Sequence, residues 1–187
     1  MSARPALLVA ALAVTLLGAP GCLVLSLHPA YDDDSLAWDP ALIGAWRDEE
    51  DTATMKIEAA EWRSYRVHYE HPSEKGDLTG FLTIVGDAHY LDLMPARGED
   101  HGSFLTPLHA ILRVDFADDK LTLTPLGYDW FADALRARRS VGDLDAVFDQ
   151  KQNVLIVSPT ARLRSWLRKR PADNPSWGAA ATFTRTQ

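Results

Sequence analysis

The chain has 187 residues, one cysteine and a formal net charge of −7, with 19 Lys and Arg against 26 Asp and Glu. This length fits one domain with a sizeable hydrophobic core. The acidic balance argues against nucleic acid as a partner, because such binding depends on cations that neutralise phosphates. A single cysteine excludes an internal disulfide, so the core itself must stabilise the fold.

The first 22 residues carry an export pattern. Arg4 precedes an apolar run at residues 6–17, and the small or helix-breaking residues 18–21 separate this run from Cys22. This arrangement is typical of a signal peptide. An uncleaved membrane helix and a plain secretion signal stay open as alternatives, because residues 6–27 carry no charge and could span a bilayer.

The residues around Cys22 resemble the lipobox of bacterial lipoproteins, with Ala19 and Pro20 at positions where that family usually has Leu and then Ser or Ala. The resemblance implies that residues 1–21 are removed as a signal peptide and that Cys22 becomes an acylated, palmitate-bearing first residue. It implies a bacterial cell-envelope protein whose membrane partner is reached through Cys22. Because Leu23 and not Asp follows the cysteine, we expect the outer membrane, facing the periplasm.

Residues 22–37 are expected to form the lipid anchor and a tether, since they show no hydrophobic period and contain an acidic run at residues 32–34. Residues 38–187 are expected to form the folded domain. Removal of residues 1–21 would take away Arg4 and no acid, so the net charge of the mature chain would be −8. Residues 26–29 and 39–46 resemble a group of predicted bacterial lipoproteins of unassigned function, which implies no activity.

The segment from Trp38 to Trp46 is similar to the first motif of lipocalins, in which an Asp-Pro turn precedes a Gly-x-Trp strand. Asp39 suits a helix cap, Pro40 suits the first helical position, and Gly44 allows a tight passage into the strand. The resemblance implies a barrel whose closed end is plugged by Trp46, with Arg185 stacked on it as a structural pair. An unrelated β-rich fold remains the alternative.

Apolar and polar residues alternate along the middle of the chain, which predicts a meander of strands. The predicted strands lie at residues 54–59, 63–70, 78–85, 89–94, 104–116 and 121–125. Gly-Asp pairs at residues 76–77 and 86–87 predict hairpin turns, and residues 118–119 predict another turn. Residues 95–103 are expected to form a longer loop.

The pattern changes after residue 125. Asp129 can cap a helix from Trp130 to about Arg139, and Ser158 can cap a second helix that ends before Pro171. Strands are predicted at residues 144–148, 153–157 and 180–186, the last beside the first strand of the sheet. The predicted fold is mainly β (β-rich α+β), an antiparallel meander that closes into a lipocalin-like barrel with two short helices in the C-terminal third.

A barrel of this size holds either packed side chains or one small ligand. Aromatic and aliphatic residues on the expected inner face indicate a site for a small apolar ligand, lined by Tyr65, Val67, Tyr69, Leu112 and Val114. The alternative is a structural or interaction module with a packed core. No protein partner can be named.

The second predicted helix is strongly basic, with Arg162, Arg164, Arg168, Lys169 and Arg170. Arg136, Arg138 and Arg139 end the first. Cations at helix C-termini are favourable in themselves. They could also contact anionic headgroups or an acidic partner, since each such charge contributes about 1 kcal/mol near an anionic membrane.

No enzymatic motif is found. The chain lacks Gly-x-Ser-x-Gly and phosphate-binding glycine loops, and its histidines show no recognised metal-ligand spacing. Acidic clusters at residues 48–51 and 118–119 occupy expected turns. We therefore expect no catalytic residue, no metal and no cofactor.

Overall fold

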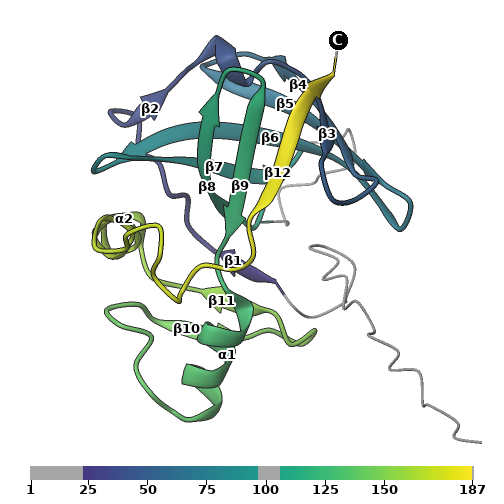
Figure 1. Ribbon diagram of the computed structural model, residues 1–187. Coiled ribbons are helices and arrows are strands. Elements are labelled where there is room, and N and C mark those ends of the chain that lie inside the picture. The colour runs from purple at the N-terminus through teal and green to yellow at the C-terminus, as the bar shows by residue number, and fades with distance from the viewer. Residues whose placement is uncertain (1–22, 97–105, 187) are drawn as a thin grey trace, which may run out of the picture.

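The computed structural model describes residues 23–96 and 106–186, which form an antiparallel β-barrel with a second layer against its outer wall (Figure 1). Eight strands make the barrel: β3 (Gly44–Asp48), β4 (Thr54–Ala59), β5 (Ser64–His71), β6 (Glu74–Val85), β7 (Ala88–Pro95), β8 (Ala110–Ala117), β9 (Lys120–Pro125) and β12 (Ala181–Thr186). They follow the order β6-β5-β4-β3-β12-β9-β8-β7, and pairing of β6 with β7 closes the ring. The predicted mainly β, closed antiparallel barrel is confirmed.

The strands form where apolar residues alternate with polar ones. In β4, Met55 and Ile57 are buried inside the barrel while Lys56 between them is exposed. The last strand, β12, pairs with both β3 and β9, and so joins the first barrel strand to the seventh. This agrees with the expectation that the C-terminal strand lies beside the first.

The turns agree with the sequence in two places and differ in one. Gly86 has φ +64° in the β6–β7 turn and Asp118 has φ +53° in the β8–β9 turn, both as predicted turn positions. The turn predicted at residues 76–77 is wrong, because β6 already includes Gly76, which pairs with Tyr69. The chain reverses instead at Pro72 and Ser73, where proline has no N–H for the ladder.

The N-terminal segment departs from the expected tether over its described part, residues 23–37. It forms β1 (Val24–Ser26) and β2 (Leu36–Ala37), followed by the 3-10 turn η1 (Pro40–Leu42). Strand β1 pairs in parallel with β11, and β2 pairs with β6. Between these strands Ala30 is fully buried. The segment is therefore part of the fold, because partners distant in sequence satisfy its backbone.

The second layer is inserted between β9 and β12. It contains α1 (Tyr128–Arg136), β10 (Ala146–Phe148), β11 (Val154–Ile156) and α2 (Thr160–Arg168). Strands β1, β11 and β10 form a separate three-stranded sheet. Both predicted helices are present, in the C-terminal half. Ser158 does not cap α2: its hydroxyl accepts a hydrogen bond from the backbone N–H of Asp145 at 2.7 Å.

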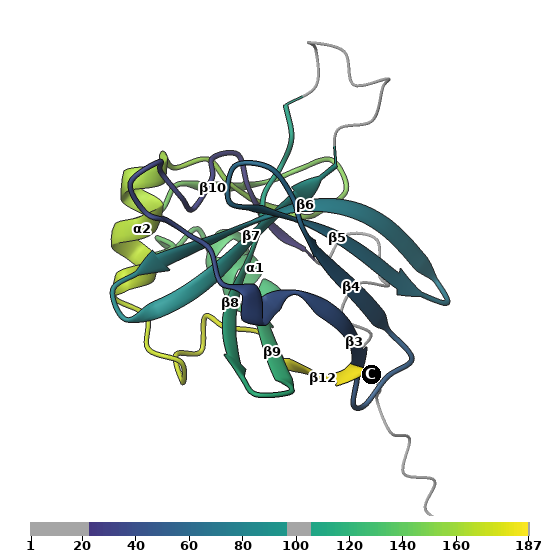
Figure 2. The same ribbon diagram turned by 90° about the horizontal axis from the view of Figure 1, so that it is seen from above.

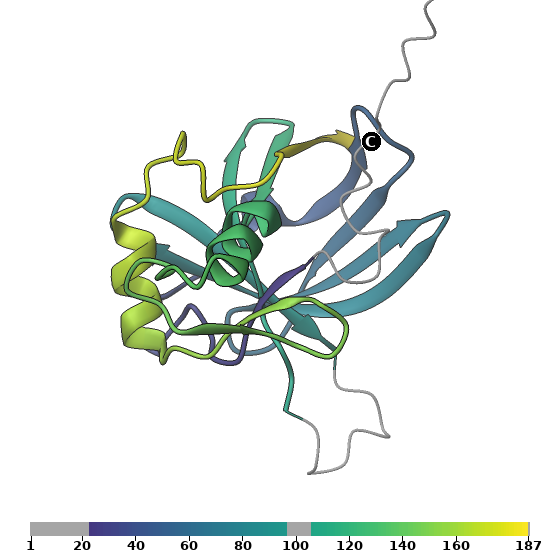
Figure 3. The ribbon, with the colours of Figure 1, turned by 90° about the horizontal axis from the view of Figure 1, so that it is seen from below.

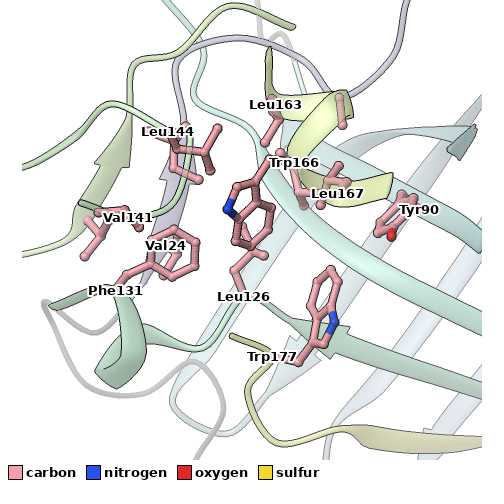
Figure 4. Close-up of a cluster of buried hydrophobic side chains, with 14 of the residues drawn as sticks. Val24, Tyr90, Leu126, Phe131, Val141, Leu144, Leu163, Trp166, Leu167 and Trp177 are labelled. Atoms are coloured by element: carbon pink, nitrogen blue, oxygen red, sulfur yellow. The ribbon is translucent and has the colours of Figure 1, made fainter. Parts of the chain in front are cut away.

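Two hydrophobic clusters follow from this arrangement. One fills the barrel, and the other lies between the barrel wall and the second layer. Figure 4 shows the second cluster, where Trp166 of α2 lies among Phe131, Leu126 and Val24. Figure 2 looks onto the barrel from above, and Figure 3 shows the two helices and the β10–β11 hairpin from below. None of the helices in residues 23–96 and 106–186 is both long and apolar enough to cross a membrane.

Candidate binding site at the barrel mouth

One end of the barrel is plugged by Trp46, which is 1 % exposed. Its indole Nε1 donates to the carbonyl of Leu42 in η1 at 3.0 Å. The guanidinium carbon of Arg185 lies 4.2 Å from the centre of the indole ring. Arg185 also donates to the carbonyls of Ile43 at 2.6 Å and Ala41 at 2.7 Å. These contacts fix η1 across this end, since the guanidinium fork serves two carbonyls while it stacks on the ring.

The middle of the barrel is filled by side chains. A Cβ on Gly80 would lie only 3.1 Å from Leu93 Cδ2 and 3.3 Å from Leu91 Cδ1. Leucine side chains therefore occupy the space that glycine leaves. This layer is a floor that a ligand cannot pass without displacing side chains.

Three of the five predicted ligand-lining residues lie in the packed part: Tyr65, Val67 and Val114 are each no more than 1 % exposed. The hydroxyl of Tyr65 accepts from the backbone N–H of Asp39 at 2.7 Å and donates to its carbonyl at 3.1 Å. Burial raises the pKa of Tyr65. These residues hold the barrel together and do not face an open space at the mouth.

The other end of the barrel carries a further set of partly buried apolar side chains. It lies where β5 ends and where β8 and β12 begin, and its inward-facing apolar side chains are only half-buried while packing against the barrel core. We call this set the mouth: Tyr69, Leu78, Ala110, Leu112 and Ala181. Two predicted lining residues, Tyr69 and Leu112, belong to it.

Carboxylates surround one side of the mouth. The pKa of Tyr69 is raised by burial and then by the nearby charges of Glu74, Asp51 and Asp48. The same negative field that disfavours a phenolate disfavours any anion placed there. The mouth is therefore an apolar surface with negative charge on one side.

Two open hollows lie elsewhere on the barrel. One, of about 410 Å³, includes Asp39, His89 and Phe116 in its lining. The other, of about 460 Å³, lies at the β5–β6 hairpin beside His71 and Pro72. Neither is lined by residues of the mouth.

A buried polar network on the outer wall of the barrel was missed by the sequence reasoning. Asp92 is fully buried, with Oδ2 accepting from the N–H of Ala30 at 2.7 Å and Oδ1 lying 2.6 Å from Nδ1 of His109. Arg164 donates to the carbonyls of Ala30 at 2.7 Å and Ile84 at 3.1 Å, and to the hydroxyl of Thr83 at 3.0 Å. We call these groups the Ala30 clamp. The signal in the sequence is a lone acid between Leu91 and Leu93.

The basic residues of α2 are mostly engaged within the chain. Arg162 and Lys169 pair with Asp145 and Asp143. Arg170 lies 4.5 Å from the ring centre of Trp166, and Arg164 belongs to the Ala30 clamp. Arg168 is exposed, and no ion pair involves it within the part of the chain that the structure covers. These contacts favour a structural role for the cations.

The remaining predicted positions are placed as follows. Cys22 lies outside the described residues, as does most of the predicted loop at residues 95–103. Among residues 23–96 and 106–186, no three His, Cys, Asp or Glu side chains are grouped as metal ligands.

Comparison with known proteins adds no relative: no protein family, no curated protein and no solved structure matches the chain.

Proposed function

We propose that this protein is a lipid-anchored protein of the bacterial cell envelope that holds a small apolar ligand at the mouth of a lipocalin-like barrel. The observation that carries the proposal is the contrast along the barrel axis. Half-buried apolar side chains at the mouth stand above a packed floor at Gly80. The lipobox resemblance at Cys22 supports the anchor, and the eight-stranded closure with an Arg185–Trp46 pair supports the lipocalin-like reading.

The floor limits the size of the ligand. A ligand could occupy only the outer half of the barrel, where Leu78, Leu112 and Tyr69 offer apolar surface. The carboxylates near Tyr69 disfavour a carboxylate or phosphate group of a ligand at the mouth. The proposed ligand is therefore a short apolar group with a neutral or cationic head.

Titration with a matched pair of dyes tests this proposal. Neutral N-phenylnaphthylamine should bind with enhanced fluorescence, and anionic anilinonaphthalene sulfonate should bind at least about tenfold more weakly, given the cost of placing an anion beside carboxylates. Leu112→Glu puts a charge into the mouth and should abolish binding of the neutral dye. Val147→Glu is the control, because Val147 is 49 % exposed in the second layer.

Equal binding of the neutral dye by Leu112→Glu and by the wild-type protein would contradict the site.

The lipid anchor is tested separately, by the mass of the N-terminal peptide after expression with the leader. This mass should show cleavage before Cys22 and added acyl chains.

A second candidate function is an interaction module that works through its outer surface. Trp62 is 89 % exposed and has φ +57°, an unusual backbone region for an aromatic residue. Trp38 is 43 % exposed. Absence of dye binding to the wild-type protein would favour this alternative.

A further inference from the structure

The described fold begins at Leu23, which directly follows the proposed lipid attachment in the sequence. The backbone N–H of Leu23 donates to Oδ1 of Asn153 at 3.3 Å, and its carbonyl accepts from the N–H of Val154 at 2.9 Å. A tether over residues 22–37 would have reached about 55 Å when extended, at roughly 3.3 to 3.6 Å per residue. The described fold begins instead at Leu23, the residue that follows Cys22 in the sequence.

The turn that receives Leu23 is itself held firmly. The carboxylate of Asp149 accepts from the N–H of Lys151 at 2.7 Å, and from the N–H and the side-chain amide of Asn153 at 2.8 and 2.9 Å. Tyr128 of α1 donates to the carbonyl of Gln152 at 2.8 Å. Asn153 is thus oriented before it binds Leu23. These hydrogen bonds join Leu23 to the β10–β11 turn.

An apolar row crosses the sheet next to this point. Leu25 of β1 is opposite Leu155 of β11, which is opposite Val147 of β10. Their strand neighbours Val24 and Val154 face the buried cluster, so alternation places the row on the other face. Val147 is 49 % exposed. We call Leu25, Leu155 and Val147 the outer row.

We infer that this face of the second layer, the outer row together with the β10–β11 turn, lies against the lipid headgroups when Cys22 is acylated. The inference rests on the proposed lipid anchor. Apolar side chains gain free energy at the boundary of headgroups and acyl chains. At the turn, the exposed cation Lys151 offsets the negative charge of Asp149 beside anionic lipids. Asp145, which directly precedes β10, is paired with Arg162.

Site-specific quenching tests the orientation on the full-length chain. Acylation consumes the thiol of Cys22, so one introduced cysteine becomes the unique site for a thiol-reactive dye. The protein carrying Lys151→Cys or Trp62→Cys is expressed with its leader, extracted from membranes and reconstituted into phosphatidylcholine–phosphatidylglycerol vesicles with a headgroup nitroxide. The dye at position 151 should be quenched at least about threefold more than the dye at position 62, because quenching requires contact with the interface.

A charge in the outer row provides a second measurement. Val147→Asp, combined with Lys151→Cys, should lower quenching at position 151 by roughly twofold or more, because a carboxylate is repelled by anionic lipid and removes apolar contact. Ile84→Asp is the matched control, since Ile84 is 42 % exposed on β6 of the barrel. It should leave quenching at position 151 unchanged.

Equal quenching at positions 151 and 62, or stronger quenching at 62, would overturn the inference. An equal effect of Val147→Asp and Ile84→Asp would overturn the role of the outer row. If the protein without an introduced cysteine itself takes up dye, the lipid anchor fails and the inference with it, which separates the two failures.

Discussion

Arg164→Met tests whether the Ala30 clamp stabilises the fold. The substitution keeps most of the volume of the side-chain stem and removes three hydrogen bonds, to the carbonyls of Ala30 and Ile84 and to the hydroxyl of Thr83. Ala30 is fully buried, so its carbonyl would be left without a partner away from water. A hydrogen bond from a charged donor contributes about 1.5 to 3 kcal/mol, and a buried orphan group costs about 1 to 3 kcal/mol.

The contacts are partly buried, and these costs overlap. We therefore expect Arg164→Met to lower the free energy of unfolding by about 2 to 4 kcal/mol, a large part of the roughly 5 to 15 kcal/mol of a typical domain. Urea denaturation measures the change, with an unaltered m-value as the sign of two-state unfolding. Arg168→Met, an exposed position on the same helix, is the control and should change it by less than about 0.5 kcal/mol.

A double-mutant cycle with Asp92→Leu sharpens the test. Asp92 holds the N–H of Ala30 and Arg164 holds its carbonyl. Loss of either should release residue 30, so the double variant should be less destabilised than the sum of the single variants by about 1 to 2 kcal/mol. Additive effects, or a loss below about 1 kcal/mol for Arg164→Met, would refute the clamp.

Three further outcomes are expected. Arg185→Lys loses the paired hydrogen bonds from the planar guanidinium to the carbonyls of Ile43 and Ala41. It should lower the free energy of unfolding by about 1 to 2 kcal/mol. An unchanged urea midpoint would contradict a stabilising role for Arg185 at the Trp46 end of the barrel. Gly80→Val should lower the free energy of unfolding by about 1 to 3 kcal/mol in the same assay, because a Cβ at this position would lie only 3.1 Å from Leu93 Cδ2. An unchanged free energy of unfolding would contradict tight packing at this layer. Hydrogen bonding from Asn153 holds the pKa of Asp149 below its usual range, so the stabilisation is present above the unfolded-state pKa near about 4 and is lost as pH falls through the lower folded-state pKa. Urea midpoints at neutral and acid pH should therefore fall less steeply for Asp149→Asn than for the wild-type protein, and parallel curves would exclude this contribution.

Local patterns predicted the barrel well because each antiparallel hairpin is encoded by neighbouring residues. Residues 54–59 alternate and become β4 with the predicted bounds, and the pair at 86–87 turns the chain as expected. The turn predicted at residues 76–77 is wrong, because a Gly-Asp pair forms a turn only where the pairing of two strands ends. Pro72 ends the pairing earlier, and Gly76 is then one more residue of β6.

Long-range pairing could not be read in the same way. Strand β1 pairs in parallel with β11, whose residues lie 130 positions further along the chain. No pattern in residues 23–34 indicates this pairing. The mouth was predicted only in part, because alternation identifies the inner face without saying how deep each residue lies. Tyr65 and Tyr69 share that face, yet the former is fully buried and the latter is half-buried.

The order of the strands has a consequence for how the protein reaches its final state. The last strand, β12, pairs with both β3 and β9, and the first strand, β1, can pair only after β11 has been synthesised. Such non-local pairings make folding slow, since distant segments must meet before either is stabilised. A chain in which β12 (Ala181–Thr186) is not yet in place has a ring that is open between β3 and β9. Completion of the barrel thus depends on β12, and a truncation that removes this strand should leave exposed sheet edges that are prone to association.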